Sequence, residues 1–117
     1  MFFPAHAVQA YIATGATDMR KSINGLSILV TDQLALDPLS GHLFVFCNRK
    51  RDILKILYWD RNGFCLWQKR LERDRFRWPR SEAEVLALHG HELSWLLDGL
   101  SLEQHEAHRH LPFAELV

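Results

Sequence analysis

The sequence has no apolar run approaching the roughly 18 residues that a helix needs to cross a bilayer, so we expect no transmembrane helix and no membrane partner. Residues Met1 to His6 have neither a basic segment nor a long apolar core, and they do not resemble a signal peptide. There are only two cysteines, Cys47 and Cys65, both in apolar, strand-like surroundings. We expect reduced, buried thiols in a cytoplasmic protein, with a disulfide between neighbouring strands as the alternative.

Signatures of metal and cofactor binding are also missing. The chain has no glycine-rich phosphate loop, no Cys-x-x-Cys pair and no His-Glu-x-x-His motif. The tail histidines His105, His108 and His110 have a spacing that suits at most a weak transition-metal site. We therefore expect no structural zinc and no cofactor.

The acidic residues of the sequence give little support for a catalytic function. Four of them are candidates for a metal-dependent nuclease cluster: Asp18, Asp60, Glu72 and Asp74. Surface ion pairing explains them more simply, because each lies beside basic residues or in a turn. We expect no enzymatic activity and keep a small metal-dependent nuclease as the weakest alternative.

Positive charge is scarce outside one window of the chain. Eleven of the fourteen Lys and Arg residues lie between Arg49 and Arg80 with four acids, so the window carries 11 − 4 = +7. The other residues include three basic and ten acidic side chains, a net of 3 − 10 = −7. Because a local positive field attracts a polyanion whatever the total charge is, this window is the candidate contact with DNA phosphates.

The predicted DNA-binding residues lie in two parts of this window. One part is a turn between two expected strands, and the other begins at the end of the last strand and continues into the loop after it. Successive turns of an antiparallel meander lie at opposite ends of a sheet, so these two parts are expected at the same end, away from Arg61. The predicted residues are Arg49, Lys50, Arg51, Lys69, Arg70, Arg73, Arg75, Arg77 and Trp78.

Two aromatic residues alternate with arginines in the second part. Aromatic side chains interleaved with arginines can stack on exposed bases, which is the function considered for Trp78. An aromatic pair that leads into a proline more often packs onto a sheet, so we favour packing for Phe76 and leave both interpretations open for Trp78. The basic stretch as a whole could instead be a solvated face that protects a sheet edge, or a surface that pairs with acidic helices.

Periodicity and turn signals predict a single α+β domain over residues 1–117, with a tail from about residue 102 that is poorly ordered. We expect an N-terminal strand that joins the sheet, a helix capped by Asp18 or alternatively by Thr17, a three-stranded antiparallel meander and two short C-terminal helices. The expected strands are Val8–Thr14, Leu43–Cys47, Ile53–Trp59 and Phe64–Leu71, and the two C-terminal helices are Ser81 to about Gly90 and Glu92–Leu97.

Two patterns carry much of this fold prediction. The strand Ile53–Trp59 is apolar on both parities, which is typical of a central strand covered on both faces. Ser81 followed by Glu84 fits a capping box, and this spacing favours a helix. A DNA-reading helix-turn-helix is not expected there, because residues 81–117 have seven acids and one arginine, a net of −6.

Several motifs, in order, resemble a known family. They are Ala13–Ser22, Leu36–Gly41 followed by Leu43–Phe46, Asn48–Asp52, Lys55–Asp60, Asn62–Phe64, Lys69–Glu72 and Phe76–Pro79. Together they are similar to small accessory proteins, called TnpB or the second-frame product, of bacterial insertion sequences of the IS-sixty-six class. The resemblance covers about residues 8 to 100, and it is distinct from the larger RNA-guided nuclease that shares the name TnpB.

The resemblance implies a role in DNA transposition beside a separate, larger transposase that holds the catalytic acids, and it assigns no catalytic residue to this chain. Our first hypothesis is a non-catalytic DNA-binding accessory protein. Its expected nucleic-acid partner is DNA, most simply the ends of the element. Its expected protein partner is the transposase, another accessory protein or a second copy of this chain. The second hypothesis is a protein–protein adaptor in the transposition complex without direct DNA contact.

Overall fold

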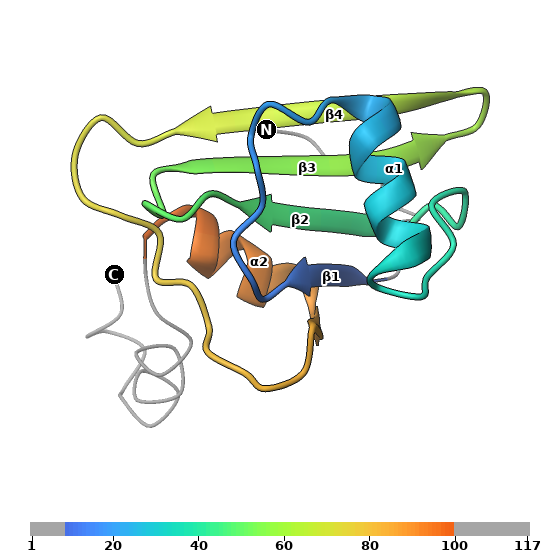
Figure 1. Ribbon diagram of the computed structural model, residues 1–117. Coiled ribbons are helices and arrows are strands. Elements are labelled where there is room, and N and C mark those ends of the chain that lie inside the picture. The colour runs from blue at the N-terminus through green and yellow to red at the C-terminus, as the bar shows by residue number, and fades with distance from the viewer. Residues whose placement is uncertain (1–8, 100–117) are drawn as a thin grey trace.

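A five-stranded sheet forms the centre of the molecule, with one helix against each of its faces (Figure 1). The computed structural model describes residues 9–99 of the chain. The strands lie in the order β4-β3-β2-β1-β5. In chain order the elements are β1 (Ala10–Ala13), α1 (Ile23–Asp32), β2 (Leu43–Cys47), β3 (Ile53–Asp60), β4 (Gly63–Arg70), β5 (Val85–Leu88) and α2 (Gly90–Leu97).

The sheet is mixed, and its pairing decides which loops meet. Strands β2, β3 and β4 pair antiparallel in chain order, whereas β1 pairs parallel to β2 and antiparallel to β5. Strands β1, β2 and β4 therefore finish at the same end of the sheet, where β3 and β5 begin. We call this the carboxyl end of the sheet. The connections after β1, β2 and β4 all leave from it (Figure 1).

Alternation of side chains along the strands builds a core on each face. On one face Phe44, Phe46 and Leu57 pack with Leu26 and Val30 of α1. The residues of the other core come from the strands, from α2 and from the loop after β4: Ala10, Ile12, Leu43, Val45, Cys47, Leu54, Ile56, Phe76, Leu88, Leu93 and Leu96. The prediction that the apolar strand β3 is covered on both faces is confirmed. Removing this apolar surface from water is the main force that holds the layers together.

The prediction of a helix beginning at Ser81 was wrong. Residues Val85–Leu88 form β5, which pairs antiparallel with the whole of β1. A four-residue apolar run suits a strand as well as a helix, and here it satisfies the backbone groups of β1 on the side away from β2. The Ser81 hydroxyl accepts a hydrogen bond from Ala83 N at 3.1 Å, which makes a local turn instead of capping a helix.

The second C-terminal helix is present as α2, two residues longer at its start than predicted. It begins after His89, whose backbone N–H donates to the Glu92 carboxylate at 3.1 Å in a capping box. The prediction that Asp18 caps the first helix was wrong, because α1 begins at Ile23 after Ser22. The Asp18 carboxylate instead accepts hydrogen bonds from Arg20, from its backbone N–H at 2.9 Å and its guanidinium at 2.7 Å. These bonds lower the pKa of Asp18 to about 2.

The positions of the two cysteines in the sheet determine whether they can form a disulfide. Cys47 is buried on β2 and Cys65 is half-buried on β4, and both are free thiols. Because β3 lies between these two strands, the two cysteines are not on neighbouring strands. Within residues 9–99 no helix is both long and apolar enough to span a membrane. Val8 and the tail from about residue 102, with its three histidines, lie outside the described residues.

Candidate nucleic-acid interface

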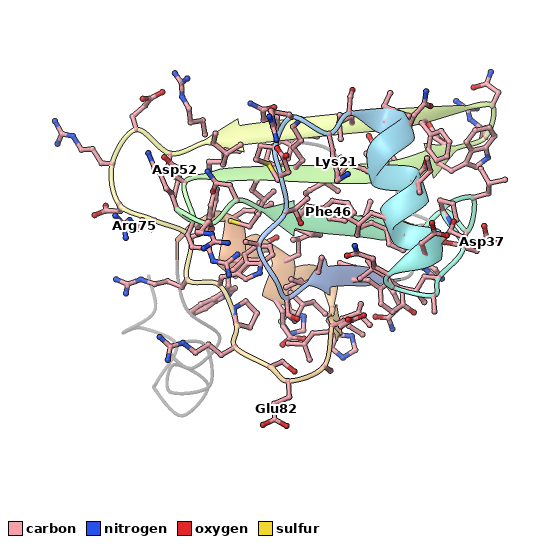
Figure 2. The ribbon with its side chains drawn as sticks, viewed as in Figure 1. Lys21, Asp37, Phe46, Asp52, Arg75 and Glu82 are labelled. Carbon is pink, nitrogen blue, oxygen red and sulfur yellow. The ribbon has the colours of Figure 1, made fainter. Side chains whose placement is uncertain are left out.

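Two basic segments meet at the carboxyl end of the sheet. One is the β2–β3 turn, residues 48–52, and the other is the long loop after β4, residues 71–84. Two backbone hydrogen bonds join them: Leu71 N donates to Asp52 O at 2.8 Å, and Phe76 N donates to Arg51 O at 2.7 Å. Figure 2 shows Asp52 and Arg75 at this end and Asp37 at the opposite end of the sheet.

The β2–β3 turn is organised by the side chain of Asn48. Its Oδ1 accepts hydrogen bonds from the backbone N–H groups of Asp52 and Ile53, both at 3.1 Å, and its Nδ2 donates to the Asp52 carboxylate at 2.6 Å. Arg51 adopts a left-handed backbone conformation with φ of 63°, which costs roughly 1–2 kcal/mol for a residue with a Cβ. The turn therefore leaves Arg49 and Lys50 exposed while it fixes Arg51 against the loop.

Phe76 fixes the long loop to the molecule. Its side chain is 2% exposed and belongs to the core on the α2 face, as the sequence predicted. Burial of a phenylalanine side chain contributes roughly 1.5–3 kcal/mol relative to leaving it in water. Arg75 and Arg77, the residues on either side of it, are exposed. One buried aromatic residue thus presents two flanking arginines to solvent.

Trp78 links three parts of the carboxyl end. Its indole Nε1 donates a hydrogen bond to Ala13 O, the last residue of β1, at 3.1 Å. The guanidinium carbon of Arg51 lies 5.5 Å from the centre of the indole ring, a cation–π contact. The ring is half-buried and packs against the core on the α2 face. The packing interpretation of Trp78 is therefore supported, and base stacking by the half-buried side chain stays a prediction.

The structure brings together all but one of the nine predicted residues. The exception is Lys69, which lies on the α2 face of β4, where its Nζ donates to Leu97 O at the end of α2 at 3.0 Å. Sequence reasoning missed Arg80, which lines a pocket with Trp78. The sequence feature that could have identified Arg80 is its position, two residues after Trp78. We define the basic face as the eight cations at this end: Arg49, Lys50, Arg51, Arg70, Arg73, Arg75, Arg77 and Arg80.

The remaining cations of the window lie elsewhere. Lys55 is only 8% exposed, and its Nζ donates to Met19 O at 2.9 Å and to Lys21 O at 2.8 Å. Arg61 is in the β3–β4 hairpin at the opposite end of the sheet, 3.8 Å from the Asp60 carboxylate.

The basic face carries a large excess of positive charge. Its eight cations lie in residues 48–52 and 70–80, which also hold three carboxylates, Asp52, Glu72 and Asp74, so the net charge is 8 − 3 = +5. Glu72 pairs with Arg70 at 3.0 Å, and the Asp52 carboxylate is bound by Asn48. Within residues 9–99, no ion pair engages the other seven cations of the basic face. Arg51 is half-buried and stacks on Trp78. The remaining six are exposed: Arg49, Lys50, Arg73, Arg75, Arg77 and Arg80.

The two acidic residues that follow Arg80 in the loop, Glu82 and Glu84, do not pair with the basic face. Figure 2 shows Glu82 extending away from the sheet into solvent. Glu84 lines a different pocket of about 200 Å³, beside Gln33 and the residues that follow β1. In the described part of the chain, neither carboxylate makes an ion pair with an arginine of the basic face. The cations therefore remain available to a partner.

A family model described as "IS66 Orf2 like protein" matches residues 8–107. The chain belongs to this family. The resemblance identified from the sequence motifs is thereby confirmed, and the protein is an accessory protein of an insertion sequence.

Two relatives from Sinorhizobium fredii are similar to this chain over most of its length. The protein y4hO is 45% identical over 93 residues, which are 80% of this chain and 81% of the relative. The protein y4jC is 36% identical over 100 residues, which are 86% of each chain. Both carry the description "uncharacterized protein", so neither name states an activity. No solved structure matches.

Two open pockets hollow the basic face of this IS66 Orf2-like protein. The first, of about 440 Å³, is lined by Thr14, Arg51, Phe76, Trp78, Pro79, Arg80 and Ser81. The second, of about 370 Å³, is lined by Arg51, Asp74, Arg75, Phe76 and Arg77. The two pockets share Arg51 and Phe76, so the hydrogen-bonded junction between the turn and the loop lies between them.

The four carboxylates considered for a nuclease do not converge. Asp60 lies in the hairpin at the end of the sheet opposite to Glu72 and Asp74. Asp18 is bound to Arg20 and Glu72 to Arg70. Across residues 9–99, no group of three or more His, Cys, Asp or Glu side chains is arranged to hold a metal ion. The geometry of the described residues thus gives the nuclease hypothesis no support.

Proposed function

We propose that this protein is a non-catalytic DNA-binding accessory factor of insertion-sequence transposition, and that its basic face contacts the phosphates of DNA at the element ends. One observation carries the proposal. The β2–β3 turn and the loop after β4 are hydrogen-bonded together, so their cations form one face with an excess of five positive charges. Family membership supports the same conclusion, because an insertion-sequence accessory protein works where DNA is the substrate.

Phosphate binding by such a face has a measurable signature. Each phosphate neutralised by a Lys or Arg releases condensed counterions from the DNA, so affinity falls as salt rises. If the basic face neutralises about four to six phosphates, the slope of log K against log salt is about −4 to −5 on duplex DNA. The contacts themselves carry little sequence information, because phosphates are the same at every base pair.

The test is a fluorescence-anisotropy titration of a labelled duplex carrying the element's terminal repeat, repeated over a range of salt. The variant Arg73→Ala/Arg75→Ala/Arg77→Ala removes three exposed cations of the basic face. We expect its salt slope to be shallower by about 3, with a similar loss of affinity on an unrelated duplex. The matched control, Arg20→Ala/Lys21→Ala/Arg61→Ala, removes three exposed cations outside the two segments and is expected to retain the slope.

Absence of salt-sensitive binding at low salt would contradict the proposal and favour the adaptor hypothesis instead. An equal effect of both triple variants would also contradict it, since charge would then act without regard to position. A loss of affinity confined to the terminal repeat would assign base readout to the loop in addition to phosphate contact.

We also propose that the protein acts with a separate transposase that supplies the catalytic carboxylates. The acidic segment 81–99 is the proposed docking surface for that transposase or for a second copy, because Glu82 and Glu84 are exposed and lie apart from the basic face. Co-purification with the transposase, lost on Glu82→Lys/Glu84→Lys and retained in Asp37→Lys, is the expected result. Retention of binding in the first variant would exclude this surface.

A further inference from the structure

The pocket beside Trp78 is open to solvent, and its volume and lining residues suit a small molecule. Its volume of about 440 Å³ falls in the range of roughly 300–1,000 Å³ that is usual for pockets enclosing a compact organic ligand. One wall is flat and apolar, made by Trp78 and Pro79, and two cations, Arg51 and Arg80, also line it. A nucleotide has the matching parts: a flat base and an anionic phosphate.

The apolar wall is held in place before any ligand arrives. The Trp78 Nε1–Ala13 O hydrogen bond ties the indole to the end of β1, and Phe76 fixes the backbone two residues earlier in the core. Trp78 N also donates to Phe76 O at 3.0 Å. Since the ring is already ordered, stacking a base on it carries a smaller entropic cost than stacking on a mobile side chain.

The polar lining suits a phosphate. Arg51 lines the pocket, with its guanidinium carbon 5.5 Å from the centre of the Trp78 ring, and a guanidinium binds phosphate oxygens through charge-assisted hydrogen bonds. Arg80 is exposed and has no ion-pair partner within residues 9–99. The Ser81 hydroxyl oxygen accepts from Ala83 N, which leaves its own O–H free to donate to a phosphate oxygen.

We propose that this pocket holds one unpaired DNA nucleotide, with its base against Trp78 and its phosphate between Arg51 and Arg80. The inference rests on the proposed function and narrows it: the basic face binds DNA that has a single-stranded segment, such as an opened or extended end. A paired base cannot enter such a pocket, because its flat faces are covered by its neighbours in the duplex. The phosphate contacts of the rest of the face would serve duplex and single strand alike.

The test compares two labelled ligands that share one duplex. The first is blunt, and the second carries a short single-stranded extension. Base–aromatic stacking predicts that the extension strengthens binding by about tenfold. A third ligand, whose extension is made of abasic sites, retains the phosphates and removes the bases. We expect it to lose most of that gain, and this result does not depend on any variant being folded.

Two variants locate the effect. Trp78→Leu keeps an apolar side chain, and we expect it to abolish the tenfold preference, which is a ratio of two affinities measured on the same variant and therefore does not depend on how the variant binds the blunt duplex. Trp59→Leu, a tryptophan in β3 at the other end of the sheet, is the matched control and is expected to retain the preference. Circular dichroism establishes that both variants are folded.

The outcomes separate this inference from the proposed function. Salt-sensitive binding of the blunt duplex without any gain from the extension overturns the pocket assignment and leaves the DNA-binding proposal standing. An abasic extension that binds as tightly as the normal one also overturns it, because phosphates alone would then explain the gain. No binding of any of the three ligands overturns the proposed function itself.

Discussion

Lys55 shows how a basic residue in a basic window can serve the fold instead of the surface. It is the one interruption in the apolar strand β3, and it lies opposite Phe46 of β2 in the register of the sheet. Its ammonium group is satisfied by two backbone carbonyls, Met19 O and Lys21 O, from the segment that leads into α1. The buried lysine therefore fixes the β1–α1 connection across the sheet.

We predict that Lys55→Met destabilises the protein by about 1–3 kcal/mol, because two carbonyl groups lose their donor while the apolar stem is conserved. Urea unfolding followed by circular dichroism measures the change. Lys50→Met, an exposed position five residues earlier, is the control and should be nearly neutral. An unchanged free energy of unfolding in Lys55→Met would show that these hydrogen bonds contribute nothing net.

The buried thiol of Cys47 gives a prediction about pH. Burial raises the pKa of Cys47 from 9.0 to about 11, although the nearby Arg51 guanidinium acts in the opposite direction. The folded protein thus keeps this proton at a pH where the unfolded chain has lost it. The contribution to stability is complete below about pH 9 and is lost as pH rises through about 11.

We therefore expect the free energy of unfolding to fall more steeply between pH 9 and 11 in the native protein than in Cys47→Ala. The difference between the two slopes isolates this group from lysines and tyrosines that titrate in the same range. Identical slopes in the two proteins would mean that Cys47 titrates alike in the folded and unfolded states.

At the scale of elements, α2 is tied to β4 by a charged contact. The Lys69 ammonium donates to Leu97 O in the last turn of the helix, where unpaired carbonyls and the helix dipole favour a cation. Leu93 and Leu96 bury the helix against the sheet, and Lys69 adds a polar contact at its end.

We predict that Lys69→Met lowers the free energy of unfolding by about 0.5–2 kcal/mol, as expected for one hydrogen bond of a charged group at a helix terminus. DNA affinity should fall less than in Arg73→Ala, whose side chain is exposed. The neighbouring Arg70→Met, which breaks only an exposed ion pair with Glu72, is the stability control. A normal stability combined with a large loss of DNA affinity would assign Lys69 to the interface instead.

A comparison of predicted and observed bounds shows which helices and strands the sequence could predict. The strands β2, β3 and β4 could be placed within a residue at each end, because apolar runs of five to eight residues are separated by an Asn-Gly hairpin and a polar turn. Strand β5 could not, because the four residues Val85–Leu88 fit either periodicity and only the free side of β1 makes them a strand. The start of α1 was missed because Asp18 forms a local turn with Arg20.

At the scale of the whole molecule, the neutral chain is divided into regions of opposite charge. The sequence could predict that the turn after β2 and the loop after β4 lie at one end of the sheet, since both follow from antiparallel pairing. It could not predict that Phe76 N bonds to Arg51 O, or that Trp78 reaches Ala13 O. These contacts join residues 25 to 65 positions apart, and they depend on how the loop packs in three dimensions.

The central claim is that the two basic segments act as one DNA-binding face, and amide NMR shifts measured during a titration with element-end DNA test it most directly. We predict that the largest shifts occur together in residues 48–52 and 70–81, while the β3–β4 hairpin around Arg61 and the C-terminal turn of α1 stay unchanged. Shifts centred on the hairpin, or confined to only one of the two segments, would contradict it.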